Sequence, residues 1–325
     1  MRKCIIIIFG PTGVGKTDFG ELLAQKISGE IVNADMGQFY TPLTIGTAKP
    51  DWRNSPIPQH LFDSINEPRM MSVAEYRDAV TTIIHDIWNR NSIPVLIGGS
   101  GFYLQSLFFP PIAAGTKKVD NYYGPENERW NLLYSIDPER ALRIHHNDMY
   151  RINRALDIFY TTGKKPSDQM PHYTPLGSFC FVYLERDRQD LYDRINHRAQ
   201  MMLQEGWLQE VERLRGTAWE PFLKKKKLIG YDDILNYLEA DKTKQEFEQL
   251  VEAISQKTRN YAKRQITFGN QLFGQLEKAL FETSDARSSC FRFNLTSGKV
   301  DLYINQLLSQ IGQMQCFEKY GSQNV

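Results

Sequence analysis

The stretch that decides the fold is C-I-I-I-I-F-G-P-T-G-V-G-K-T, residues 4–17. Its first six residues form a continuous apolar run, which is typical of a parallel β-strand buried on both faces. A glycine-rich loop follows, and beyond Thr17 apolar residues recur at helical spacing up to about Ser28. This order of strand, glycine-rich loop and helix predicts a P-loop α/β fold with a doubly wound parallel sheet.

The loop matches the pattern G-x-x-x-x-G-K-[ST] in full, between a buried strand and a helix. Its backbone N–H groups are expected to surround an anion, Lys16 to reach the terminal phosphates, and the Thr17 hydroxyl to bind Mg²⁺. The residues predicted to hold the phosphates are Gly10, Pro11, Thr12, Gly13, Val14, Gly15, Lys16 and Thr17. The motif indicates a polyphosphate with magnesium, but it does not say which polyphosphate.

Two further strands are expected to end near this loop. Residues 30–35 read as a second strand that ends at Asp35, and residues 94–97 as a third that ends at the turn G-G-S-G, 98–101. The other elements expected for this core are a helix at 72–90, a strand at 178–184, a helix at 187–215, a strand at 291–295 and a closing helix after residue 298. Ligands bind outside the carboxyl ends of such strands, so the three loops are expected to meet there.

The pattern changes between residues 110 and 175, a stretch that begins and ends with prolines. Two apparent helices, at about 125–134 and 138–162, predict a helical insertion in the α/β core. The expected organisation is therefore a first part of the core at 1–109, the insertion at 110–175 and a second part of the core at 176–316. The polar tail, 317–325, is expected to be disordered.

Composition places limits on the partners. The chain has 325 residues, 41% apolar and 24% charged, and a net charge of +1, so a nucleic-acid surface would require local clustering of basic residues. Its four cysteines show no metal spacing and indicate a reducing, cytoplasmic compartment. No stretch approaches the roughly 18 apolar residues of a membrane span. We expect a cytoplasmic monomer without a membrane partner.

Asp35 has several roles open to it on position alone. A carboxylate beside the phosphate loop could hold a metal-bound water, take a proton from an acceptor, or cap a helix. In a P-loop kinase the same aspartate would face the phosphoryl acceptor. The choice depends on the residues around it.

A set of motifs, in order along the chain from residue 5 to about 270, resembles the tRNA dimethylallyltransferase family. Besides the phosphate loop, they are N-A-D-M-G-Q-F-Y (33–40), I-G-T-A-K-P (45–50), Q-H-L-F-D (59–63), S-V-A-E-Y-R (72–77), P-V-L-I-G-G-S-G-F-Y (94–103), R-I-H-H-N-D-M-Y-R-I-N-R-A-L-D-I-F (143–159), L-I-G-Y (228–231) and T-R-N-Y-A-K-R-Q-I-T (258–267). The ordered set of motifs is highly specific for this family. Of the single motifs, only I-G-T-A-K-P is close to decisive by itself.

The resemblance implies an activity and the roles of several residues. Enzymes of this family transfer a dimethylallyl group from dimethylallyl diphosphate to the N6 amine of the adenosine 3′ of the anticodon in tRNA, and release diphosphate. Asp35 matches the general base, while Lys16, Thr17 and Mg²⁺ would stabilise the leaving diphosphate. Lys227 stands where members can carry an arginine that helps to bind the diphosphate.

The same resemblance implies contacts with the tRNA anticodon stem-loop. They are expected from Asp35, Met36, Gly37, Gln38 and Ser100 around the target, and from the basic residues Arg151, Arg154, Arg259, Lys263 and Arg264. Met36 and Gly37 depart from the serine and arginine common in the family, and Ser100 replaces the usual threonine. The insertion would clamp the anticodon stem. A third basic cluster, Arg186, Arg188, Arg194 and Arg198, begins the helix after the fourth strand.

Three other functions remain open. A P-loop mononucleotide kinase could use R-I-N-H-R, residues 194–198, as an arginine lid and would consume ATP. A prenyltransferase acting on free adenine nucleotides would share the phosphate loop and Asp35 but would need no stem-binding insertion. A nucleotide-dependent switch would need a base-reading motif, and the sequence shows none for guanine.

Overall fold

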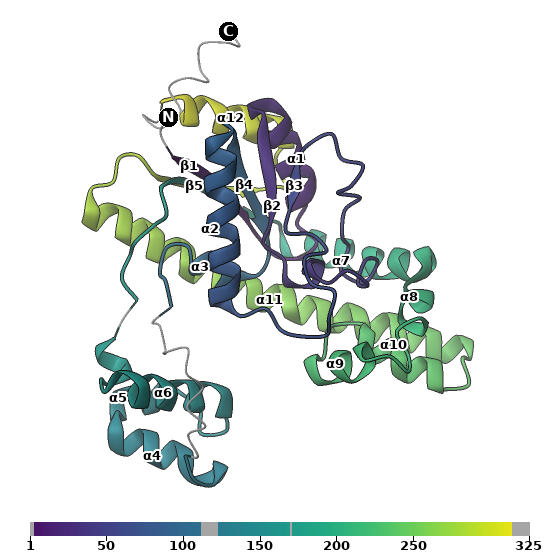
Figure 1. Ribbon diagram of the computed structural model, residues 1–325. Helices are drawn as coiled ribbons and strands as arrows, with labels where there is room; N and C mark the ends of the chain where they lie inside the picture. The colour runs from purple at the N-terminus through teal and green to yellow at the C-terminus, as the bar shows by residue number, and fades with distance from the viewer. Residues whose placement is uncertain (1–2, 112–122, 170, 314–325) are drawn as a thin grey trace. The chain divides into compact units, whose positions relative to one another are not determined.

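The protein, as a computed structural model, is described for residues 3–111, 123–169 and 171–313. In these ranges, six parallel strands form one sheet in the order β3-β2-β4-β1-β5-β6 (Figure 1). The strands are β1 (Cys4–Phe9), β2 (Gly29–Asn33), β3 (Gln59–His60), β4 (Ile93–Gly98), β5 (Ser178–Glu185) and β6 (Ser289–Asn294). This sheet confirms the predicted α/β fold class.

Helices cover both faces of the sheet. On one face, Ile6 and Ile8 of β1 belong to a core that α1 (Lys16–Ile27) and α12 (Val300–Gln313) complete. On the other face, Phe9 contacts Phe268 of α11 (Lys244–Thr283), and α2 (Val73–Asn89) lies against β4. Alternate residues of one strand thus bury into two different layers, which explains why the apolar run of β1 is continuous.

The central strands end in register at the sheet edge from which the predicted loops leave. Phe9, the last residue of β1, pairs with Gly98 of β4 and with Tyr183 of β5. On β2, Asn33 pairs with Ile97. The loops that follow these four strands therefore leave the sheet at nearly the same height.

The predicted single helix at 187–215 is wrong. Its periodic pattern divides into α7 (Arg188–Met202), a π-helical turn (Leu203–Trp207) and α8 (Leu208–Glu212). Gly206 has a φ of 108°, a left-handed conformation that favours glycine, and this breaks the helix. The short helices α9 (Trp219–Lys226) and α10 (Tyr231–Glu239) follow.

The longest helix among the described residues, α11, has 40 residues. Thr243 and Glu246 form a capping box at its start, where each side chain accepts from the other residue's backbone N–H. The helix contacts α7 and α10 and continues along the sheet to β6 (Figure 1). In the part of the chain that the structure describes, no helix is both long and apolar enough to cross a membrane.

The chain divides into two compact units, one of residues Met1–Gln105 with Leu176–Val325 and the other of Ser106–Pro175. The second unit contains α4 (Arg129–Ile136), α5 (Pro138–Leu142) and α6 (Met149–Thr162), packed around a small apolar core of their own. The helix predicted at 138–162 is therefore two helices. Asp148 begins the second, because its carboxylate accepts from the backbone N–H of Arg151 at 3.1 Å.

The second strand is also shorter than predicted. It ends at Asn33, and Asp35 lies two residues beyond it. The Asn33 side chain accepts from the backbone N–H of Asp35 at 2.8 Å, which shapes this exit from the sheet. The tail at 317–325 and the fourth cysteine, Cys316, lie outside the described residues.

Candidate active site

The phosphate loop lies between β1 and α1, and its shape requires glycine at several positions. Gly13 and Gly15 have φ values of 82° and 104°, in the left-handed region. At Gly10, a Cβ would approach the carbonyl oxygen of Leu184 to 2.5 Å. The strand and helix are thus joined by a tight loop whose amides can surround an anion at the start of α1.

Lys16 folds back over this loop. Its Nζ donates to the carbonyl oxygens of Gly10 and Pro11, both at 3.0 Å. Burial lowers the pKa of Lys16 to about 8, while the charge of Asp35 opposes the shift and that of Arg198 adds to it. A buried ammonium group is therefore held at the loop, within electrostatic range of both residues.

Three arginines that follow β5 bind three successive residues of the loop. The Nε of Arg186 donates to the carbonyl of Val14 at 2.8 Å, and the Nε of Arg194 to that of Gly13 at 2.9 Å. The guanidinium of Arg198 donates to the hydroxyl of Thr12. The sequence singles these arginines out as a basic cluster, but it indicates a role at the phosphates only for Arg194 and Arg198, as the arginine lid of the kinase alternative. Arg194 and Arg198 are four residues apart, so they share one face of a helix, and this spacing is the sequence signal for their common role.

Gln265 of α11 joins the phosphate loop to the glycine turn after β4. Its Oε1 accepts from the backbone N–H of Thr12 at 2.8 Å, and its Nε2 donates to the carbonyl of Gly99 at 2.9 Å. The side chain is buried. Gln265 stands in the motif T-R-N-Y-A-K-R-Q-I-T, but the sequence gives it no role, because only the fold brings position 265 to positions 12 and 99.

Asp35 reaches the same place from the exit of β2. A Cβ added to Gly99 would lie 3.6 Å from Oδ2 of Asp35 and 2.2 Å from Nε2 of Gln265. The negative charge of Asp35 acts on Lys16, on Arg198 and on Tyr261 of α11. A carboxylate, two cations and the phosphate loop therefore share one site, assembled from the ends of β1, β2, β4 and β5.

Neighbouring loops hold Asp35 in position. The backbone N–H of Met36 donates to the hydroxyl of Ser100 at 3.0 Å, which ties the residue after Asp35 to the glycine turn. The side chain of Gln38 donates to the carbonyls of Thr47 and Ala48, both at 3.2 Å. The segment 36–39 is thus fastened both to the turn after β4 and to the I-G-T-A-K-P loop.

A buried carboxylate fixes that second loop. Glu210 of α8 accepts from the backbone N–H groups of Thr44, Ile45 and Gly46 at 3.0, 2.7 and 3.2 Å. It also accepts from the hydroxyl of Tyr231 at 2.7 Å. Four donors surround one carboxylate that is 3% exposed, so Glu210 anchors residues 44–46 of this loop.

The remaining predicted residues are placed in different surroundings. Lys227 is exposed just after α9, and among the described residues no hydrogen bond or ion pair of its side chain connects it to the phosphate loop. Arg259 is engaged between α7 and α11, where it donates to Asn196 and pairs with Glu252. Lys263 and Arg264 are exposed on α11, and Arg151 and Arg154 are exposed on α6 of the second unit.

The chemistry of the loop fits a magnesium ion bound through phosphates. Thr17 is an exposed residue in the first turn of α1, beside Lys16. Within the described ranges, no three His, Cys, Asp or Glu side chains gather as a metal cluster. Mg²⁺ needs only one or two protein oxygens when phosphates and waters supply the rest, so Thr17 is a suitable ligand.

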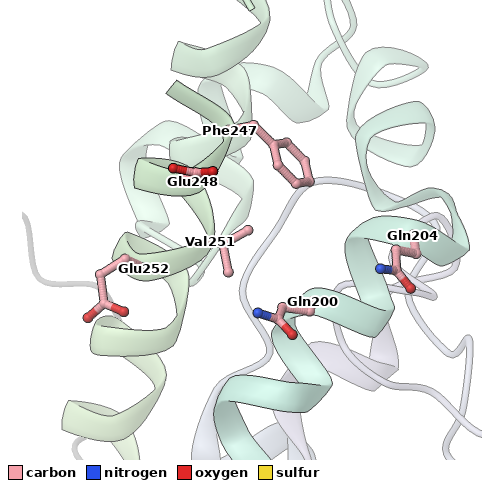
Figure 2. Close-up of a pocket in the computed structure, with 6 residues that line it drawn as sticks. All are labelled: Gln200, Gln204, Phe247, Glu248, Val251 and Glu252. Atoms are coloured by element: carbon pink, nitrogen blue, oxygen red, sulfur yellow. The ribbon is translucent and has the colours of Figure 1, made fainter. Parts of the chain in front are cut away.

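A separate cavity of about 510 Å³ lies between the C-terminal part of α7, with the π-helical turn after it, and the N-terminal part of α11. Figure 2 shows its walls, with Gln200 and Gln204 on one side and Phe247, Glu248, Val251 and Glu252 of α11 on the other. Two carboxylates and no cation line it. It does not suit a polyphosphate, in contrast to the arginine-rich surroundings of the loop after β1.

With this geometry established, comparison with known proteins gives one consistent result. A family model described as IPP transferase matches residues 38–271. A tRNA dimethylallyltransferase of Alkaliphilus oremlandii is 35% identical over 285 residues, which cover 82% of this chain and 88% of the relative. One of Bacillus cereus (strain Q1) is 34% identical over 317 residues, which cover 94% and 98%.

Solved structures resemble the fold as well. The crystal structure of a tRNA delta(2)-isopentenylpyrophosphate transferase from Staphylococcus epidermidis is similar with a TM-score of 0.65 and 27% sequence identity. The match covers 96% of this chain and all of that one. The similarity thus extends over both compact units.

Proposed function

The chain belongs to the IPP transferase family and is a prenyltransferase, and from this premise we propose that it transfers a dimethylallyl group from dimethylallyl diphosphate to tRNA. The acceptor is the N6 amine of the adenosine 3′ of the anticodon, and diphosphate is released. Membership confirms the resemblance carried by the ordered motifs. The observation that supports the proposed chemistry is the meeting of Asp35 with Lys16 and Arg198 at the phosphate loop.

The donor diphosphate would be held by the loop amides, Lys16 and the arginines of α7. When the bond between the prenyl carbon and the diphosphate oxygen breaks, negative charge builds up on that oxygen. Fixed cations and N–H groups stabilise this charge more in the transition state than before it, which is the condition for faster chemistry. Arg198 and Arg194 supply charge at Thr12 and Gly13, on the α7 side of the loop.

Magnesium, held by the Thr17 hydroxyl and phosphate oxygens, would neutralise charge on the diphosphate. The protein's own contribution is the orientation of that diphosphate by the loop between β1 and α1. Lys227 remains a proposed additional contact. Its side chain is exposed, so it would have to reach the donor from outside the loop.

Asp35 would act on the acceptor. The lone pair of an exocyclic adenine amine is delocalised into the ring, so a base that removes a proton as the C–N bond forms is of value. Asp35 lies beside Gly99, against which the side chain of Gln265 also packs. The C–N bond forms, the C–O bond of the donor breaks, and the amine proton passes to the Asp35 carboxylate.

The RNA contacts follow from exposed cations. Lys263 and Arg264 on α11, and Arg151 and Arg154 on α6, can bind backbone phosphates of a stem-loop. Met36, Gly37, Gln38 and Ser100 surround Asp35 on the acceptor side. We propose that the second compact unit clamps the anticodon stem. Monomeric state and cytoplasmic location remain predictions.

A single assay tests this function against its alternatives. The purified chain is incubated with unmodified tRNA, Mg²⁺ and labelled dimethylallyl diphosphate, with AMP and ATP in parallel reactions. We expect label in tRNA without ATP. Label in AMP instead of tRNA would favour the enzyme class that acts on free nucleotides, and phosphoryl transfer from ATP would favour a kinase; either result contradicts the proposal.

A further inference from the structure

Two aromatic side chains form a small platform beside the glycine turn. Phe102, the second residue of α3 (Gly101–Gln105), is 63% exposed. Its ring centroid lies 4.9 Å from that of Phe268 on α11, with the ring planes 63° apart. The Phe102 ring is therefore open to contact with a ligand, and neither ring has a part in the proposed chemistry.

The sheet and the start of α3 pack against the Phe268 ring of this platform. Phe268 also contacts Phe9, the last residue of β1, at a centroid distance of 6.4 Å. A Cβ at Gly101 would lie 2.3 Å from the ring of Phe268, so the start of α3 packs directly on that ring. The position of Phe102 is therefore set by the sheet and by α11.

Its location is on the acceptor side of the site. Phe102 follows Ser100 by two residues, and the Ser100 hydroxyl accepts from the backbone N–H next to Asp35. The residue that connects this turn to the phosphate loop is Gln265, which accepts a hydrogen bond from the backbone N–H of Thr12. A molecule that lies against Phe102 is thus close to the turn that carries Ser100 and that is tied to the segment after Asp35.

Two exposed cations lie on α11 about one turn before Phe268. Arg264 precedes Phe268 by four residues, so the two lie on one face of α11, about 6 Å apart along the helix axis. The guanidinium of Arg264 lies 5.7 Å from the ring centroid of Tyr261. Lys263 adjoins it, and in the described part of the chain neither residue makes an ion pair. An exposed ring with neighbouring free cations matches a nucleobase with its phosphodiester.

We propose that Phe102, supported by Phe268, stacks an unpaired nucleobase of the substrate RNA next to the target adenosine, while Arg264 and Lys263 bind the adjoining phosphates. This inference rests on the proposed function only in taking RNA as the acceptor. Removing the target base from its loop stack costs a few kcal/mol, and stacking of a neighbour on the protein offsets part of that cost.

The test measures RNA affinity directly, by fluorescence anisotropy of a labelled anticodon stem-loop. Phe102→Ala should weaken binding by roughly 5- to 150-fold, the range expected for the loss of one base–aromatic stack. Phe102→Trp should retain binding because it keeps an aromatic face. The control is Phe281→Ala, since Phe281 is 87% exposed near the end of the same helix α11 and should leave affinity unchanged.

A second measurement identifies the base. Abasic substitution at one anticodon-loop position should weaken binding to the wild-type protein and should add nothing to the Phe102→Ala defect. The proposal is overturned if Phe102→Ala binds the stem-loop as the wild type does, or if the abasic and protein changes are additive at every loop position. It is equally overturned if only KM for dimethylallyl diphosphate rises, because the rings would then contact the prenyl group.

Failure of the proposed function would look different. If the wild-type protein binds the stem-loop with the expected coupling but transfers no prenyl group, the stacking proposal stands and the assigned reaction is wrong. Binding of inorganic diphosphate to the Phe102→Ala variant provides the check on folding, and it should equal that of the wild type.

Discussion

The side chain of Gln265 accepts a hydrogen bond from the backbone N–H of Thr12 at 2.8 Å, across 253 residues of sequence. The same amide donates to Gly99 on the acceptor side. One buried side chain therefore sets the distance between the donor's phosphate loop and the turn beside Asp35.

Replacing Gln265 with leucine should affect stability and donor binding together. The change leaves the Thr12 N–H and the Gly99 carbonyl without their partner, at about 1–3 kcal/mol of unfolding free energy for each group that stays buried. Diphosphate affinity should fall as well, because the loop loses its fixed position. Urea unfolding and calorimetric titration with diphosphate measure the two effects. Gln271→Leu, an exposed position on the same helix, is the control, and equal behaviour of the two variants would contradict the account.

The pKa of Lys16 predicts how diphosphate affinity depends on pH. The group titrates at about 8 in the free protein, and a bound diphosphate favours its charged form. Diphosphate affinity should therefore be highest and constant below about pH 8. Above this pH it should fall, by at most about tenfold per pH unit, because binding then requires the uptake of one proton by Lys16. Lys16→Arg stays charged throughout and should remove the decline between about pH 8 and 9.5. A wild-type profile as flat as that of the variant would exclude this role.

Substitution at Glu210 should loosen the loop around residues 44–46. In Glu210→Gln the carboxylate becomes an amide with one acceptor oxygen, so at least one of its four donors loses its partner. We expect a loss of about 1–3 kcal/mol in unfolding free energy and faster amide hydrogen exchange at Ile45 and Gly46. Tyr231→Phe removes one donor and keeps the carboxylate, so exchange at these amides should change little. Unaltered exchange in Glu210→Gln would show that the loop has another anchor.

The parts of the site that the sequence predicts are those with local signals. The apolar run of β1 and the spacing of Gly10, Gly15 and Lys16 define a strand, a turn and a cation within a few residues of each other. The same holds for Asp35, which lies near the end of a readable strand. Local pattern is sufficient where one short segment makes both the structure and the site.

The rest depends on contacts between distant segments. Arg198 and Gln265 reach the phosphate loop from helices far along the chain, and their neighbours in the sequence do not reveal that both contact Thr12. The helix breaks were missed for a related reason. The apolar residues around Gly206 keep helical spacing, so the sequence does not show that the helix breaks there. Asp148 is identified as the N-cap of α6 only by its hydrogen bond with the backbone N–H of Arg151.

The central claim is that Asp35 serves the acceptor amine while the phosphate loop holds the donor, and a comparison of the wild type with Asp35→Asn tests it most directly. The measurement is single-turnover transfer of label from dimethylallyl diphosphate to tRNA, with tRNA and diphosphate affinities determined on the same preparations. We predict that transfer falls by about 10²–10⁴, the usual contribution of a general base, while both affinities stay close to the wild type. Transfer at the wild-type rate would contradict the claim, and equal losses of transfer and of tRNA binding would make Asp35 a structural anchor instead.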